Sequence, residues 1–166
     1  MEIVQGGPEH VDAAALIWAH GVAARDGHAE VPTLAQARPG VENALAHEPS
    51  LFLLAVRGGV PIGFLAGGPL RTDSGVAYVN YVGVHPDAWG EGVGEALLRA
   101  LPGALAERGY EAAQLHVFVD NVRGVRLYER LGWRKAGAAA PHPRTGRVEQ
   151  RYEFFAVTPA RRSAGD

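Results

Sequence analysis

The sequence contains no cysteine and almost no serine. Without cysteine, the chain has no disulfide, no thiolate metal site and no cysteine nucleophile. Its serines are Ser50, Ser74 and Ser163, and none of them lies in the G-x-S-x-G turn of a hydrolase. We therefore expect no covalent acyl intermediate on the protein and no metal site.

Long apolar runs and an excess of basic charge are also lacking. No apolar stretch approaches the roughly 20 residues that a membrane helix needs, and the start, MEIVQGGPEH, lacks a signal-peptide pattern. Sixteen basic and eighteen acidic side chains give a formal net charge of −2, whereas nucleic-acid and anionic-membrane binders need a basic excess. We expect a cytoplasmic protein that acts on a small molecule or peptide, with neither nucleic acid nor membrane as a partner.

The 166 residues, 47% hydrophobic and 20% charged, match one folded domain. We predict a single domain over residues 1–157 and a mobile tail over 158–166. Pro102 predicts a kink or break in one helix, and 138–147 is predicted to be a turn. The order of strands and helices along the chain predicts a mixed α/β domain with helices on the sheet faces. The predicted strands are 2–5, two runs flanking Gly58-Gly59, 76–85, 112–120, 133–137 and 150–157. The first predicted helix begins at Pro8, and the others cover 34–47, 92–108 and 121–130.

The densest motif is HPDAWGEGVGEALLRAL at 85–101, where a strand ends, glycines follow and an amphipathic helix begins. Glycines let backbone N–H groups approach an anion closely, and the unpaired N–H groups and dipole of a helix N-terminus favour negative charge. The spacing of Gly90, Gly92 and Gly94 does not fit G-x-G-x-x-G, and no G-K-[ST] follows. A dinucleotide or P-loop site is therefore disfavoured, and from the spacing alone a plain surface loop is the alternative.

Two stretches resemble the signatures of the GNAT superfamily of acyl-CoA-dependent N-acyltransferases. Residues 82–86 match the family's V-x-V-x-P run, and W-G-E-G-V-G at 89–94 is similar to its Q/R-x-x-G-x-G/A signature. The second signature is similar to LHVFVDNVRGVRLYERLGW at 115–133. The resemblance covers about residues 50–157, and the first fifty in element order only. It implies a mixed, mostly antiparallel sheet of about six to seven strands, flanked by helices on both faces, with a splayed central strand.

The resemblance also implies an activity. A member of this family transfers an acetyl group from acetyl-CoA to a primary amine by direct attack in a ternary complex, which agrees with the lack of a side-chain nucleophile. Tyr128 matches the family's general acid and is expected to protonate the departing thiolate, because tyrosine with a pKa of about 10 is protonated at neutral pH. The alternative for Tyr128 is a half-buried helix aromatic. Dimers are common in the family, so a homodimer is a further expectation.

Acetyl-CoA contacts are implied on the central strand, the glycine turn and the last helix. Trp89 replaces the family's Arg or Gln, so weaker CoA binding or the use of another Arg is expected. Gly83 suits a bulge or a close ligand approach, with a glycine packed under an aromatic ring as the alternative. Asn121 is equally a predicted helix N-cap. The implied contacts are Val82, Gly83, Val84, Trp89, Gly90, Glu91, Gly92, Val93, Gly94, Glu95, Asn121 and Arg126, with Arg123 and Arg126 as candidates for the phosphates and solvated surface arginines as the alternative.

The acceptor side has no comparable motif. Some family members carry a Glu on the central strand six residues before Val84, but Tyr78 stands there. A loop with three polar side chains, at 24–32, would favour a cationic amine. The identity of the amine stays open among amino acids, polyamines, aminoglycosides, peptide N-termini and protein lysines. The candidates for binding or deprotonating it are Asp26, His28 and Glu30 in that loop, Tyr78 and Asn80 through a water relay, and His85 and His116.

Two other functions compete with acetyl transfer. A non-catalytic CoA-binding or regulatory domain of the same fold is favoured by Trp89 and Tyr78 and opposed by Tyr128. A dinucleotide-dependent enzyme would bind NAD and gain no protection from CoA.

Overall fold

A computed structural model describes residues 1–156 of the chain. Val157, the last residue of the final predicted strand, and the tail predicted at 158–166 lie outside the described residues. Within them, no helix is long and apolar enough to cross a membrane. The elements are β1 (Glu2–Gln5), a 3-10 turn (Pro8–His10), α1 (Val11–Asp26), α2 (Leu34–Ala44), β2 (Leu51–Arg57), β3 (Val60–Leu70), β4 (Asp73–Val84), a second 3-10 turn (Pro86–Ala88), α3 (Val93–Glu107), β5 (Ala112–Phe118), α4 (Val122–Arg130), β6 (Arg134–Pro141) and β7 (Val148–Phe155).

The predicted order of elements is confirmed, with two corrections. Helix α3 runs without a break through Pro102, because Leu97, Leu101 and Leu105 are buried along one face and their packing offsets the roughly 3 kcal/mol cost of an interior proline. Strand β6 continues to Pro141 and so takes up the first four residues of the predicted turn at 138–147, since a bulge between Ala136 and Ala140 lets its pairing with β7 resume.

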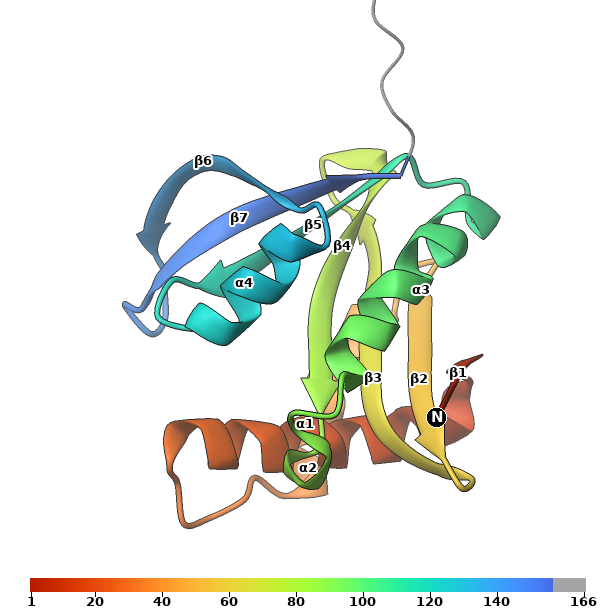
Figure 1. The fold of residues 1–166 in the computed structure, drawn as a ribbon, viewed down its shortest axis with the longest axis vertical. Helices are drawn as coiled ribbons and strands as arrows, with labels where there is room; N and C mark the ends of the chain where they lie inside the picture. The colour runs from red at the N-terminus through yellow and green to blue at the C-terminus, as the bar shows by residue number, and fades with distance from the viewer. Residues whose placement is uncertain (157–166) are drawn as a thin grey trace, which may run out of the picture.

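The seven strands form one sheet in the order β1-β2-β3-β4-β5-β7-β6. All neighbouring strands are antiparallel except β4 and β5. Alternating residues of β2 separate the two cores: Leu51 and Leu53 pack with α3, and Phe52 and Leu54 pack with α1 and α2. Helices α3 and α4 thus cover one face and α1 and α2 the other, which confirms the predicted layers (Figure 1).

The parallel pair of the described strands, β4 and β5, separates along its length. The two strands pair from Val76↔Ala112 to Tyr78↔Gln114, and no register pair joins them beyond that point. Figure 1 shows β4 continuing towards α1 while β5, with β7 and β6, turns away to the other side. The predicted splayed central strand is therefore β4, and its last residues border an opening in the sheet.

A bulge in β4 positions the side chains along this opening. Tyr81 pairs with Ala66 and Val79 pairs with Gly67, which leaves Asn80 without a partner on β3. The extra residue shifts the alternation, so Val79 packs on the α3 face before the bulge and Val82 packs there after it. At Gly83 the structure shows the aromatic ring of the predicted alternative: a Cβ there would lie 2.5 Å from Cε1 of Phe64, so this glycine makes room for the ring.

Candidate active site in the opening of the sheet

A cleft of about 1340 Å³ runs through the opening between β4 and β5. Its walls come from α1, the two splayed strands, the turn before α3, and α4. Parallel strands bring their carboxyl ends to one edge, where ligands of α/β proteins bind. The predicted site residues that line this cleft are Tyr78, Asn80, Val82, Gly83, Val84, Trp89, Gly90, Gly92, Val93, Gly94, Glu95, His116, Asn121, Arg123, Arg126 and Tyr128.

Backbone groups of β4 point into the opening at alternate residues. The His85 N–H donates to the carbonyl of Ile62 at 2.9 Å, so His85 and Gly83 form the hydrogen-bonded pairs with β3. The N–H and C=O groups of Val82 and Val84 therefore face the gap, whereas those of Gly83 face β3. The Val84 carbonyl accepts a 2.8 Å hydrogen bond from the indole Nε1–H of Trp89. Of these two residues, Val82 is therefore the one whose N–H and C=O both face the cleft without a partner on β3 or Trp89.

The glycine turn after β4 adopts the conformation that its residues predict. Gly90 and Gly92 have φ angles of 83° and 79°, in the left-handed region that favours glycine. Gly92 is the N-cap of α3, and Asn121 caps α4 by accepting a 3.1 Å hydrogen bond from the Gly124 N–H, as predicted. Two helix N-termini, each with unpaired N–H groups, thus border the same cleft.

The charges near these helix N-termini favour an anion. Glu91 is paired with Arg57, and Glu95 with both Arg99 and Arg130, at 2.8 and 2.7 Å. The hydrogen bond from Arg99, together with Arg130, holds the pKa of the Glu95 carboxyl below its usual range. The negative charge of each of these two carboxylates is therefore offset by arginine.

The two arginines predicted to contact phosphate lie on the same wall. A Cβ at Gly90 would lie 3.7 Å from Nη2 of Arg123, so that guanidinium borders the glycine turn. Among residues 1–156, neither Arg123 nor Arg126 has an ion-pair or hydrogen-bond partner for its side chain. These two positive charges are thus available to a bound anion.

Tyr128 projects from α4 into the cleft and is half-buried. Its ring packs edge-on against Trp133, with centroids 5.8 Å apart, and beside Tyr152. Burial raises the pKa of Tyr128 to about 12. The phenol is therefore a proton donor, not an anion, across the physiological pH range.

The opposite side of the cleft carries other titratable groups. The Tyr78 hydroxyl lies 2.7 Å from Nδ1 of His116 on β5. Burial, and then the charge of Glu149 on β7, raise the pKa of Tyr78 to about 12. Glu149 lines the cleft beside them and was not predicted. No local motif marks it, because strand pairing places it opposite Phe118, which lies two residues beyond His116.

The structure does not bring the predicted acceptor loop into the cleft. His28 and Glu30 are exposed and do not line it. Asp26 accepts hydrogen bonds of 2.9 and 3.1 Å from Arg25, and its pKa is lowered mainly by them. Its negative charge is thus already paired.

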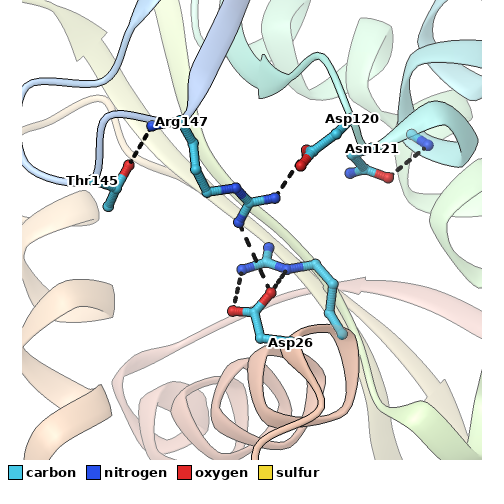
Figure 2. Close-up of polar contacts among 7 residues, drawn as sticks. Asp26, Asp120, Asn121, Thr145 and Arg147 are labelled. Carbon is cyan, nitrogen blue, oxygen red and sulfur yellow. Dashed lines mark hydrogen bonds and ion pairs between the residues drawn. The ribbon is translucent and has the colours of Figure 1, made fainter.

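An arginine from another part of the chain completes this cluster. Figure 2 shows the guanidinium of Arg147, from the turn between β6 and β7, between Asp26 at the end of α1 and Asp120 after β5. Arg147 donates to Asp120 at 2.9 Å and lies 3.9 Å from Asp26. Its guanidinium carbon also lies 3.9 Å from the centre of the Phe118 ring. These contacts join three segments at the rim of the cleft.

Within residues 1–156, no three His, Asp or Glu side chains are grouped as a metal site.

The sequence and the fold are both similar to those of known acetyltransferases. A curated acetyltransferase of Sodalis glossinidius, SG1711, is 40% identical over 91 residues, which are 55% of this chain and 62% of that protein. The ribosomal-protein-S18-alanine N-acetyltransferase of Escherichia coli has the same fold, with a TM-score of 0.75 and 22% identity over 97% of both chains. The yncA protein of Salmonella typhimurium, solved with its cofactor acetyl-CoA, gives a TM-score of 0.73 and 21% identity over 99% of both chains. The model of the acetyltransferase (GNAT) family matches residues 18–133, more than half of the chain, and the chain therefore belongs to this family.

Proposed function

We propose that this protein is an N-acetyltransferase that transfers an acetyl group from acetyl-CoA to a primary amine by direct attack in a ternary complex. The observation that carries the proposal is the opening between β4 and β5. One wall of this opening holds two helix N-termini and two unpaired arginines among the described residues, and Tyr128 faces the same space. An extended anionic thioester fits such a wall, because its phosphates need N–H donors and positive charge.

Each group in the opening has a step to perform. The N–H of Val82 faces the gap and donates to the thioester oxygen as negative charge develops there, which is worth about 10²–10³-fold for a single donor in acyl transfer. The amine nitrogen attacks the carbonyl carbon, and the carbon–sulfur bond breaks. Tyr128 then gives its phenolic proton to the departing sulfur, so that CoA leaves as the thiol, and a proton lost by the acylated nitrogen restores the phenol.

The departure at Trp89 changes the cofactor site without removing it. Its indole N–H is already bonded to the Val84 carbonyl, and an indole carries no charge for a pyrophosphate. We assign that contact to Arg123, whose guanidinium borders Gly90. The backbone donors of the turn are independent of the side chain at position 89.

A thiol-release assay tests the proposal. Acetyl-CoA is incubated with the protein and a panel of primary amines, free CoA is measured, and the acetylated product is identified by its mass. We expect CoA release that depends on the amine and a product heavier by one acetyl group. If acetyl-CoA raises the melting temperature but no amine releases CoA, the protein is a non-catalytic CoA-binding domain. If NAD stabilises it and CoA does not, it is a dinucleotide-binding protein.

A further inference from the structure

The sheet face opposite α3 and α4 carries a row of polar side chains on β5 and β7. On β5 this face presents Gln114, His116 and Phe118, because Leu115 and Val117 are buried on the other face. On β7 the residues opposite them are Glu153, Arg151 and Glu149. Helices α1 and α2 have their buried contacts on β2 and β3, so this face of β5 and β7 stays partly exposed. Tyr78 reaches it from β4, across the paired end of the opening.

From these contacts we infer that the acceptor binds as an ammonium ion against Glu149 and loses its proton to the Tyr78–His116 pair. The inference rests on the proposed acetyl transfer and deepens it, since it names the charge state of the acceptor and the groups that deprotonate it. Tyr78 stands where some family members carry a carboxylate, and Glu149 supplies a carboxylate to the same cleft from another strand.

The electrostatics of this face favour a cation at Glu149. Among residues 1–156, the Glu149 side chain has no ion-pair or hydrogen-bond partner. The neighbouring charges are already paired: Arg151 lies 3.7 Å from Glu153, and Arg25, which lines the cleft from α1, bonds Asp26. Arg147, whose guanidinium lies over Phe118, is paired with Asp120, and His142 accepts backbone N–H groups of its own turn through Nδ1. Glu149 is therefore the negative charge on this side that an ammonium group can pair with.

The proton balance of the step is as follows. The ammonium nitrogen gives one proton to the Tyr78 oxygen, while Tyr78 gives its own proton to Nδ1 of His116. The products are a neutral amine, a neutral Tyr78 and an imidazolium at His116. A tyrosinate does not accumulate, because the two transfers are concerted. The relay needs neutral His116 to carry its hydrogen on Nε2, which leaves Nδ1 as the acceptor at 2.7 Å from the Tyr78 hydroxyl.

Three conservative substitutions separate the roles. His116→Gln and Tyr78→Phe each lower kcat/KM at pH 7 by about 10²-fold, as expected for loss of a general base. The double variant loses little more than either single variant, since the two groups act as one unit. Glu149→Gln mainly raises KM for the amine. His47→Gln, at an exposed site outside the cleft, is the matched control and keeps wild-type kinetics.

The pH profile of kcat/KM distinguishes a relay from a structural role. A relay makes the wild-type kcat/KM depend on pH, because only a neutral imidazole accepts the proton and Glu149 pairs only with a charged amine. In His116→Gln the rate rises continuously towards the pKa of the amine, about 10 for a lysine-like group, so the deficit at pH 7 is largely recovered near pH 10. A deficit that is constant with pH overturns the relay, as does activity within about threefold of wild type in both relay variants.

The tautomer gives a readout that needs no turnover. Imidazole ¹⁵N shifts are measured by NMR on the wild type and on Tyr78→Phe. The kinetic measurements use N-acetyl-lysine amide and n-butylamine as the amines. Hydrogen on Nε2 of neutral His116 supports the relay, and hydrogen on Nδ1 overturns it. If the wild type releases no CoA with any amine of the panel, the proposed acetyl transfer itself fails. If it releases CoA and the relay variants do too, only this inference fails.

Discussion

The two sides of the opening in the sheet are built by different means. The side that we propose for the cofactor offers backbone N–H groups within short stretches of the chain, the glycine turn at 90–94 and the cap at Asn121. The side that we propose for the acceptor offers the side chains of Tyr78, His116 and Glu149, which come from three strands and meet through strand pairing. A backbone site leaves a local pattern of glycines in the sequence, whereas a site built across strands leaves none.

Charge also divides the two sides. On the cofactor side the carboxylates Glu91 and Glu95 are each paired with arginine, while Arg123 and Arg126 lack partners among the described residues. On the acceptor side the arginines are paired, and Glu149 is the carboxylate without a partner in residues 1–156. We therefore expect an anionic ligand to be attracted to one side of the cleft and a cationic ligand to the other.

The largest effect is expected at Tyr128, the proposed general acid. Tyr128→Phe lowers kcat about 10²–10⁴-fold through loss of the general acid, while the Kd for acetyl-CoA stays at the wild-type value. Tyr110→Phe is the control, because its hydroxyl bonds the Pro49 carbonyl away from the cleft. Steady-state kinetics and calorimetric titration give both numbers. Wild-type turnover in Tyr128→Phe would remove its role as the acid.

Gly83 tests whether a residue of the family motif serves the ligand or the fold. Gly83→Ala places a methyl group 2.5 Å from Cε1 of Phe64, and overpacking of this kind costs about 1–3 kcal/mol of stability. Denaturant unfolding measures the loss, and acetyl-CoA binding by the folded protein is expected to be unchanged. Unchanged stability with weaker acetyl-CoA binding would instead assign Gly83 to the ligand.

Gly92 is expected to show the opposite division. Gly92→Ala forces an L-residue into the left-handed region, at about 1–2 kcal/mol, and relief of that strain moves the N–H donors of the turn. The KM for acetyl-CoA then rises about tenfold, since 1.4 kcal/mol corresponds to tenfold in affinity. Gly103→Ala is the matched control within α3, where no atom lies within 4 Å of the added Cβ. We expect it to raise stability slightly and leave KM unchanged. Equal KM values in the two variants would contradict a backbone site at the turn.

The smallest effect concerns the phenols of both sides. Burial raises the pKa values of Tyr78 and Tyr128 to about 12, and those of Tyr81, Tyr110 and Tyr152 are also raised. Above pH 10 the folded chain keeps protons that the unfolded chain releases. The free energy of unfolding is therefore unaffected by these groups below pH 10 and falls from pH 10 to pH 12. An absorbance titration of the native protein is expected to show little tyrosinate below pH 10, with urea-unfolded protein as the reference; early ionisation would contradict the burial.

The contrast between the two sides also explains what the sequence predicts. The element order, the hairpin at Gly58-Gly59 and the Asn121 cap follow from local patterns and are confirmed. The unbroken course of α3 through Pro102 depends on tertiary packing, which overrides the local cost of proline.

The acceptor side depends on tertiary structure still more. The expected acceptor loop at 24–32 carries acidic side chains, but Asp26 is paired with Arg25 and His28 does not line the cleft. Glu149 was missed, because its place beside Tyr78 depends on how β5 pairs with β7. Side-chain constellations of this kind follow from strand register, which no local stretch of sequence specifies.

The central claim is that acetyl-CoA enters the opening between β4 and β5 and bonds the backbone of Val82. Amide hydrogen exchange with and without acetyl-CoA tests it most directly. We expect slower exchange at Val82 and in the turn 90–94, and unchanged exchange in β2, which lies away from the cleft. Protection elsewhere on the surface with no change at Val82 would contradict the account.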